Sequence, residues 1–362
     1  MTSRPIFSTE MHDSNSELSS NQAENLVSVI IPCFNAERTL SKCLDSLLSQ
    51  KEIIPHIVCV NDGSTDNTPT ILNDYRDKSP HNISVVNQIN SGAWQARLAG
   101  LKATNSKFIM FLDSDDFAKP SFVKTMLNEI KTAKSDIAVC GFERVDEGSG
   151  RVLSKEFCTP IDSFDLSEDY GKLLKVNPAP WNKIFKSSIL TNLPNLKVNP
   201  IMLDDLCLLL SGIAHPANKI SFVPCSLIEY RVHPDSAINS VNIEQVYDAS
   251  SALKEVRSKF LSLDSHALEA FDAVAFCHLY VSMSFRLAKS QNKYSNELLA
   301  ILDKNFPLWR TSKYLSLAYA FHHGKTHVRA AIAAHLVKAG FFNQAINSYS
   351  WAKKATGKDI SW

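Results

Sequence analysis

The sequence predicts an α/β protein in which a doubly wound, mostly parallel sheet is flanked by helices and followed by an all-α C-terminal region. Three observations predict this fold. Apolar runs alternate with segments of helical spacing over residues 27–140, the pattern of βα units. The run Phe108–Leu112 is apolar throughout, as expected for a strand buried on both faces. From Val241 onward the apolar residues recur at helical spacing alone.

The elements of the first half follow in a regular order. A helix is indicated after the first strand, where Leu40, Leu44 and Leu47 share one face. Thr68-Pro69 is expected to start another helix, with Thr68 as N-cap and proline at the first helical position. Strands are expected over 27–32, 56–60, 83–86, 108–112 and 136–140, and further helices over 93–103 and 120–134. Near the C-terminus, 330–339 and 341–355 are expected to form a helical hairpin broken at Gly340.

The length of 362 residues suggests about two domains. The expected division is a disordered N-terminal extension over 1–25, an α/β domain over 26–240 and a helical domain over 241–362. The first 24 residues lack the apolar core of a signal peptide, and no run of about 18 apolar residues predicts a membrane span. The eight cysteines form no CxxC pair. This pattern favours a reducing, cytoplasmic setting.

The net charge of +1 argues against a nucleic-acid-binding protein. The charge is uneven, however, because the segment from Arg286 to Trp362 holds 12 Lys or Arg and 3 Asp or Glu. This basic region predicts a peripheral contact with anionic lipid on the inner face of the cell membrane. A surface for homo-oligomer formation and an ordinary solvated helical face are equally open alternatives.

Polar side chains follow the predicted strands, where open α/β sheets bind their ligands. The tetrad from Asp113 to Asp116 follows the buried fourth strand directly. If the chain stays extended there, Asp113 and Asp115 point to one side, and a cation between them relieves their repulsion. Hard carboxylate oxygens favour Mg²⁺ or Mn²⁺, with phosphate oxygens completing the shell. The alternative is a polar turn that caps the next helix.

A nucleoside diphosphate fits the other strand ends. Asp62 can accept a hydrogen bond from a base or ribose, Phe34 can lie against the base, and Arg97 can neutralise the diphosphate. Two alternatives stay open. Asp62-Gly63 is also typical of a tight turn, and Arg97 is also compatible with a solvated helix surface. No Gly-x-Gly-x-x-Gly follows a strand, which disfavours a dehydrogenase.

Three segments carry a resemblance to a known family: Val27-Ser28-Val29-Ile30-Ile31-Pro32-Cys33-Phe34-Asn35, Val60-Asn61-Asp62-Gly63-Ser64-Thr65-Asp66 and Phe111-Leu112-Asp113-Ser114-Asp115-Asp116. They resemble the family 2 glycosyltransferases of the GT-A fold, whose bacterial members build cell-surface polysaccharides. The resemblance implies that Pro32, Phe34 and Asp62 bind the base of a nucleotide-sugar. It also implies that Asp113 and Asp115 form a DxD motif, with Asp115 the firmer metal ligand. The expected donor-binding set is Pro32, Phe34, Asn35, Glu37, Asp62, Arg97, Asp113 and Ser114.

The second half of the expected catalytic domain resembles the family less closely. Trp181-Asn182-Lys183 is similar to a segment near the acceptor, so Trp181 and Lys183 are expected to bind substrate. Asp204-Asp205 stands where the family has an acidic pair, which implies Asp205 as general base beside Asp204. The alternative is a helix N-terminus favoured by the helix dipole. His233 lies in a segment that resembles one closing over the diphosphate, or it is an ordinary loop residue.

The resemblance therefore implies an inverting, divalent-metal-dependent glycosyltransferase. Such an enzyme would move a sugar from a nucleotide-sugar, a UDP-sugar by preference, to a hydroxyl of a glycan or lipid-linked acceptor. The alternative is a catalytically inactive nucleotide-sugar-binding subunit that docks a partner through its helical C-terminus. The intact acids at 113, 115 and 205 favour the enzyme.

Overall fold

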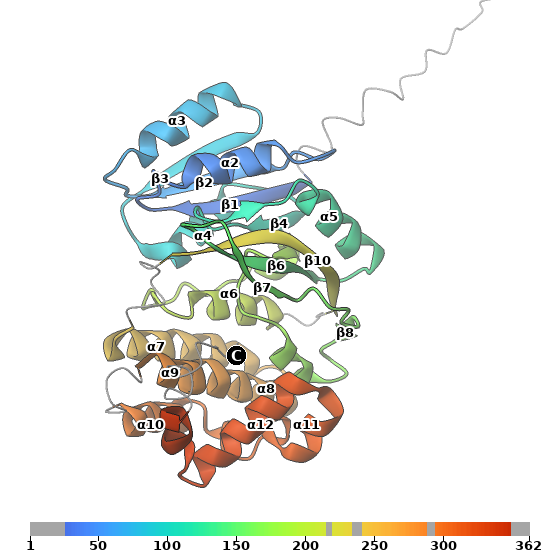
Figure 1. Cartoon of the computed structure of the whole chain (residues 1–362), viewed down its shortest axis with the longest axis vertical. Helices are drawn as coiled ribbons and strands as arrows, with labels where there is room; N and C mark the ends of the chain where they lie inside the picture. Colours follow the sequence, from blue (N-terminus) through green and yellow to red (C-terminus); the bar gives the residue numbers. More distant parts are fainter. Residues whose placement is uncertain (1–25, 215–218, 234–240, 288–293, 349–362) are drawn as a thin grey trace, which may run out of the picture.

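The computed structural model describes residues 26–214, 219–233, 241–287 and 294–348. The predicted extension over 1–25 and the end of the expected hairpin lie outside these residues. In Figure 1 the sheet and its covering helices form the upper half of the molecule, and a layer of helices forms the lower half. This arrangement confirms the predicted α/β fold with a helical C-terminal region.

One sheet contains all ten strands of the described residues. Its main path runs β3-β2-β1-β4-β9-β6-β10-β5, with β7 paired to β6 and β8 to β10. The strands are β1 Val27–Cys33, β2 His56–Asp62, β3 Ile83–Gln88, β4 Phe108–Phe111, β5 Phe117–Ala118, β6 Ile137–Asp146, β7 Val152–Glu156, β8 Phe164–Asp165, β9 Lys183–Lys186 and β10 Lys219–Val232. The strands β3, β2, β1 and β4 run parallel, as do β6 and β10. The short β9, which the sequence did not reveal as a strand, lies antiparallel between β4 and β6.

Helices cover both faces of the sheet, and each face has its own apolar core. In β1, Val29 and Ile31 face the core that includes α2 (Leu40–Leu48) and α5 (Phe122–Thr132). Ile30, between them, faces the core shared with α4 (Gly92–Lys102) and α6 (Asp204–Ile213). This alternation follows from the two-residue period of a strand. The helix α3 (Thr68–Lys78) also lies in the first half.

Two local expectations from the sequence are wrong. The N-cap of α3 is Asn67, and Thr68 is already inside the helix. The Oδ1 atom of Asp66 accepts from the backbone N of Thr68 at 2.9 Å, so an upstream carboxylate replaces the hydroxyl cap. The chain also does not stay extended after β4. It turns, and Asp116 N donates to the carbonyl oxygen of Asp113 at 3.0 Å, so strand alternation does not set the directions of the aspartates.

The C-terminal region is helical, as predicted. It comprises α7 Ile243–Phe260, α8 Ser265–Ala275, a π-helical segment Phe276–Ser282, α9 Met283–Leu287, α10 Ser295–Asn305, α11 Leu317–His323 and α12 Lys325–Lys338. Gly340, at φ +77°, follows α12, and residues 342–348 are helical. No helix in the described ranges has the length and apolarity needed to cross a membrane.

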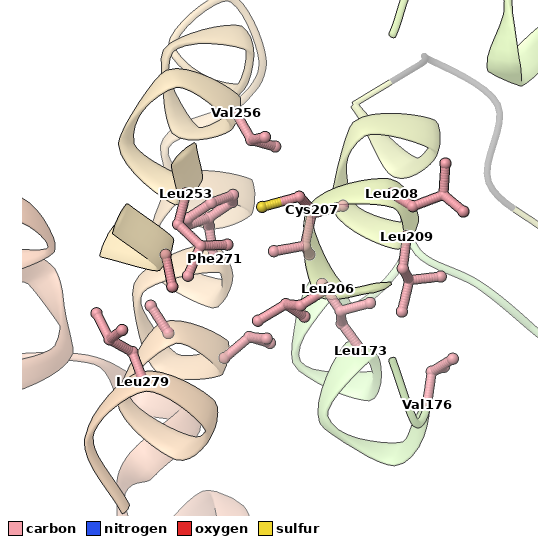
Figure 2. Close-up of a cluster of buried hydrophobic side chains, with 14 of the residues drawn as sticks. Leu173, Val176, Leu206, Cys207, Leu208, Leu209, Leu253, Val256, Phe271 and Leu279 are labelled. Atoms are coloured by element: carbon pink, nitrogen blue, oxygen red, sulfur yellow. The ribbon is translucent and has the colours of Figure 1, made fainter. Parts of the chain in front are cut away.

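The helical region shares a hydrophobic core with the sheet domain through α6. Figure 2 shows Leu206 and Cys207 of α6 directed toward Leu253 of α7 and Phe271 of α8. All four side chains are almost fully buried. Burial of apolar surface on this scale stabilises the contact by about 1.5–3 kcal/mol per large side chain. The first turn of α6 is therefore held firmly between the sheet and the helices.

Candidate active site

A cleft of about 700 Å³ opens at the carboxyl ends of β1, β2 and β4. The start of α6, the end of β10 and the helical region complete its walls. Eleven residues predicted from the sequence line it: Pro32, Phe34, Asp62, Arg97, Asp113, Ser114, Asp115, Trp181, Asp204, Asp205 and His233. The fold thus brings together side chains that are as far apart in the chain as Pro32 and His233.

Arg97 lies at the centre of the acidic end of this cleft, with its side chain only 4% exposed. One Nη atom donates to Asp113 Oδ1 at 3.1 Å. The other donates to Asp204 and lies 3.1 Å from Asp205 Oδ1. Burial alone would lower the pKa of Arg97, but the charges of Asp205, Asp204 and Asp113 outweigh it and raise that pKa. A single guanidinium therefore joins the aspartate motif after β4 to the acidic pair of α6.

The position of Arg97 follows from the packing of α4. Gly100, one turn further along α4, faces β1 so closely that an added Cβ would lie 2.3 Å from a side-chain carbon of Ile30. A larger residue would push the helix away from the sheet, and Arg97 with it. Glycine at position 100 therefore lets α4 lie close to β1, and this places the guanidinium of Arg97 within reach of the acids.

Asp204 and Asp205 form the first turn of α6. The preceding residue, Leu203, has a left-handed backbone at φ +62°, an uncommon conformation for a residue with a side chain. It turns the chain sharply and places both carboxylates in the cleft rather than in solvent. Burial raises the pKa of Asp205 to about 8, with the charges of Asp204 and Asp113 adding to the effect. Burial also raises the pKa of Asp204.

Asp115 occupies the more open part of the acidic end, with its side chain 39% exposed. Its Oδ2 atom lies 3.1 Å from His233 Nε2, just beyond the end of β10. Burial raises the pKa of Asp115, and the charge of Asp113 adds to this. Asp116 is fully buried beneath and accepts from Arg231 N at 2.9 Å. The residues predicted to close over the diphosphate after His233 lie outside the described part of the chain.

Asp62 has a structural role as well as a place in the cleft. Its Oδ1 atom accepts from Ser91 N and its Oδ2 atom from Gly92 N, each at 2.8 Å. The carboxylate therefore satisfies backbone N–H groups at the start of α4, where a negative charge is favourable. Phe34, by contrast, is 49% exposed at the cleft. An exposed aromatic ring at this edge is available to stack on a planar ligand.

Three predicted substrate-binding residues do not line the cleft. Asn35 Oδ1 accepts from Thr65 N at 2.9 Å, and Glu37 Oε2 accepts from Asn67 N at 2.9 Å. Both side chains thus join the loop after β1 to the loop after β2. Lys183 is fully buried, and its Nζ donates to Asn177 Oδ1 at 2.8 Å. Burial lowers the pKa of Lys183 to about 7, although the nearby charge of Asp205 opposes this.

Trp181 belongs to an aromatic group in the wall of the cleft. Its ring stacks on Tyr230 of β10, with centroids 5.1 Å apart and planes 11° apart. It meets Phe142 of β6 edge-on at 4.6 Å. Burial and the charge of Asp116 raise the pKa of Tyr230 to about 12. These rings form a rigid apolar wall of the kind on which sugar faces pack.

Sequence reasoning missed the contribution of the helical region to the cleft. His278 and Ser282 of the π-helical segment and Met283 and Arg286 of α9 line the cleft, together with Arg144 of β6. A π-helical turn often marks a functional site. No motif distinguishes these residues in the sequence, because their spacing is that of ordinary helix packing. The excess of basic residues from Arg286 onward was the sole available signal.

The acidic end has the chemistry of a site for a hard divalent cation. Asp113, Asp115, Asp204 and Asp205 converge there, and Arg97 is the one arginine that pairs with them among the described residues. Oxygen ligands of this kind suit Mg²⁺ or Mn²⁺. No three described His, Cys, Asp or Glu side chains form a ready-made ligand group, however. The residues therefore fit an ion whose shell is completed by oxygens of a bound substrate.

Comparison with known proteins places this geometry in a family. Residues 28–193 match the family model described as glycosyl transferase family 2. The Bacillus subtilis protein EpsH, named for glycosyltransferase activity, is 29% identical over 68% of this chain and 71% of its own length. The poly(ribitol-phosphate) beta-glucosyltransferase of Bacillus spizizenii is 32% identical over 45% of this chain, a segment that is 25% of that protein.

Solved structures extend the similarity to the fold of both regions. The crystal structure of S. aureus TarS residues 1–349 is 19% identical, with a TM-score of 0.61. The match covers 90% of this chain and 92% of TarS 1–349, so it includes the C-terminal helices as well as the sheet. Residues 28–193 therefore form a family 2 glycosyltransferase domain, and the chain has the GT-A fold followed by a helical C-terminal region.

Proposed function

We propose that the chain is an inverting glycosyltransferase, dependent on Mg²⁺ or Mn²⁺, that transfers a sugar from a nucleotide-sugar to an acceptor hydroxyl. One observation carries the proposal. Arg97 contacts both Asp113, an expected ligand of the metal ion, and the pair Asp204-Asp205, the expected acids beside the incoming hydroxyl. Single-displacement chemistry needs one group that stabilises the leaving diphosphate and another that activates the nucleophile. Candidates for both roles meet at one guanidinium in the cleft.

Asp205 is the general base in this proposal. A sugar hydroxyl becomes a good nucleophile when a positioned carboxylate takes its proton during the attack. Asp205 lies in the cleft at a helix N-terminus, and its Oδ1 atom accepts no hydrogen bond, although the positive charge of Arg97 lies 3.1 Å away. A pKa of about 8 gives the carboxylate enough basicity to accept that proton. Asp204, tied to Arg97, holds the first turn of α6 in place.

Asp115 and Asp113, with His233 beside Asp115, are the residues that would hold the metal ion. When bound, such an ion stabilises the negative charge that develops on the leaving diphosphate. Arg97 keeps Asp113 in a fixed orientation, because their contact is buried and charged. His233 Nε2, at 3.1 Å from Asp115 Oδ2, orients that carboxylate in the same way. Both contacts hold a carboxylate in one orientation before the metal ion binds, so less conformational entropy is lost on binding.

The donor side of the cleft suits a nucleotide. Phe34 offers an exposed ring for the base, and Pro32 and Asp62 lie next to it. Structures of TarS 1–349 with UDP and with UDP-GlcNAc, at TM-scores of 0.57 and 0.58, support a UDP-sugar as the donor. The acceptor in this proposal is a hydroxyl of a glycan or a lipid-linked glycan used in cell-surface polysaccharide synthesis. Contact with an anionic membrane through the basic C-terminal region belongs to the same proposal.

A panel of nucleotide-sugars tests the function directly. Purified full-length chain is incubated with each donor and Mn²⁺, without acceptor, and free nucleotide is measured. We expect one or two donors to be hydrolysed, EDTA to abolish this, and Asp115→Ala to be inactive. A chain that binds a nucleotide-sugar but neither hydrolyses nor transfers it, in any metal, would instead be the inactive binding subunit.

A further inference from the structure

Lys183 is a fully buried lysine at the start of β9, and it does not line the cleft. Its Nζ atom donates to Asn177 Oδ1 at 2.8 Å, to the carbonyl oxygen of Ala179 at 2.5 Å and to Asn182 Oδ1 at 2.9 Å. A lysine has three N–H donors only as an ammonium ion, so these three acceptors suit the charged form. One short segment of the chain therefore satisfies the whole ammonium group.

The three acceptors come from the start, the middle and the end of the segment 177–182, which precedes β9. The end of this segment is anchored to the sheet, because Asn182 Nδ2 donates to the carbonyl oxygen of Cys140 on β6 at 2.7 Å. Asn177 Nδ2 donates to Asn182 Oδ1 at 3.4 Å, which is a long contact. Lys183 supplies the shorter hydrogen bonds at the start and the middle of the segment. The segment also forms part of the cleft wall, through Asn177, Pro178, Ala179 and Trp181.

The charge of Lys183 is costly where it lies. Burial lowers the pKa of Lys183 to about 7, and the negative charge of Asp205 opposes this. Its three hydrogen-bond partners are neutral oxygens. The other lysine of β9, Lys186, is partly exposed and donates to the carboxylate of Asp136 at 2.8 Å. A buried charge without a close counter-charge is unfavourable, and proteins keep such groups chiefly where they serve function.

We propose that Lys183 is a positioning residue: its ammonium holds the segment 177–182 in the conformation that presents the Trp181 wall to the reacting sugar. This inference rests on the proposed function, because the wall matters to catalysis only if a sugar reacts in the cleft. Lys183 itself touches no substrate and acts through the segment. A misplacement of about 1 Å can lower the rate of a reaction about 10²-fold, so a wall held rigidly contributes to kcat.

The first experiment observes the wall without any turnover. The full chain is labelled with 5-fluorotryptophan, and the ¹⁹F resonance of Trp181 is assigned by its absence in Trp181→Phe. We expect one sharp resonance in the wild type and a split or broadened one in Lys183→Met, because the segment then occupies more than one conformation. The matched control is Lys186→Met on the same strand, whose Trp181 resonance should stay single and sharp. Thermal unfolding shows whether each variant is folded.

The second experiment measures the same variants with the donor that the wild type hydrolyses. Lys183→Met should lower kcat about 10–100-fold. Its Kd for UDP with Mn²⁺ should change less than about twofold, because the residues proposed to hold the nucleotide and the metal are intact. Lys186→Met should change kcat less than about twofold at a temperature well below its unfolding. A lysine with a structural role alone would lower thermal stability and leave kcat unchanged.

A double-mutant cycle tests whether Lys183 acts through Asn177. Asn177→Ala removes one acceptor and leaves the lysine in place, so kcat should fall by a smaller factor, about threefold, and the Trp181 resonance should broaden. This variant keeps the proposal testable where Lys183→Met does not fold. In the Lys183→Met background the same change should have no further effect, because the contact is already lost. An equal loss of kcat in both backgrounds would show that Asn177 acts on the substrate by itself, which contradicts the indirect role.

Two further results would overturn this inference. One is a single, sharp Trp181 resonance in folded Lys183→Met, and the other is an unchanged kcat in that variant. A wild type that hydrolyses no nucleotide-sugar with either Mg²⁺ or Mn²⁺ would instead refute the proposed function. The ¹⁹F spectra would then still decide whether Lys183 holds the segment.

Discussion

The cleft and the core of the helical region each contain an arginine paired with acids, but the numbers of partners differ. Arg257 of α7 forms two bonds to Asp272 of α8, at 2.6 and 2.9 Å, and Leu308 N donates to the same carboxylate at 2.9 Å. That pair is balanced, with one positive and one negative charge. Arg97 instead pairs with three carboxylates. The helical region holds a neutral pair, whereas the cleft holds a surplus of negative charge on partly buried carboxylates.

The difference indicates a structural role for the pair in the helical region and a functional role for the charges in the cleft. A balanced, fully hydrogen-bonded pair can fix how two helices pack without any ligand. A surplus of buried carboxylates raises the pKa values of those acids and is costly unless a cation or a proton is bound. Natural proteins retain such costs mainly at functional sites.

The largest expected effect follows from Asp205→Asn. The amide keeps the shape of the side chain but cannot take a proton, so transfer should fall by about 10²–10⁴-fold. Binding of donor, measured by calorimetry with UDP and Mn²⁺, should persist. Asp74→Asn, an exposed change on α3, is the control and should transfer sugar normally. Full transfer by Asp205→Asn would show that another group is the base.

Asp272→Ala tests the balanced pair. Removing the acid leaves the Arg257 charge buried and unpaired, which should lower the free energy of unfolding by about 3–5 kcal/mol. Urea unfolding measures this loss. Because Asp272 lies away from the cleft, kcat measured well below the unfolding temperature should stay close to the wild-type value. Loss of activity in a variant of unchanged stability would contradict the structural role of the pair.

The pH dependence of transfer tests the charge surplus. An ordinary aspartate titrates near pH ~3.9, whereas burial raises the pKa of Asp205 to about 8. The raised pKa keeps Asp205 protonated below that pH, and a general base must be deprotonated. The kcat/KM should therefore rise about tenfold per pH unit below pH ~8 and level off above it. A profile already level from pH 5 would mean that Asp205 is ionised in the free protein.

The smallest expected effect concerns the exposed ring of Phe34. Stacking of a base on an aromatic side chain contributes about 1–3 kcal/mol, so Phe34→Ala should raise the KM for donor about tenfold with little change in kcat. Phe34→Tyr keeps the ring and should change KM less than about threefold. Equal KM values for the wild type and Phe34→Ala would remove this residue from the donor site.

The sequence was sufficient to predict which residues at the strand ends line the cleft. Its residues follow strands in short, dense motifs, and parallel strands bring such residues to one edge of the sheet. Asp62, Asp113 and Asp115 all line the cleft as that rule requires. Local dihedral angles were not predictable in the same way. The turn after Phe111 and the left-handed backbone of Leu203 depend on tertiary packing rather than on the residue type.

The contribution of the helical region to the cleft could not be predicted from the sequence. Arg144 and Arg286 are 142 positions apart, and no motif connects them. Both line the cleft because the helical region packs on the sheet domain through α6, and no single segment of the sequence encodes that packing. The burial of Lys183 next to Asn177 could not be predicted either, because the strand β9 is too short to show a periodic pattern of apolar residues.

The most direct test of the central claim is calorimetric titration of UDP into the full chain with Mn²⁺ and with EDTA, for the wild type and Asp115→Ala. If the surplus of carboxylates binds a divalent ion that in turn binds the diphosphate, UDP should bind the wild type with Mn²⁺ and at least about tenfold more weakly with EDTA. Asp115→Ala should bind weakly in both conditions. Equal UDP affinity with and without metal in the wild type would contradict the claim.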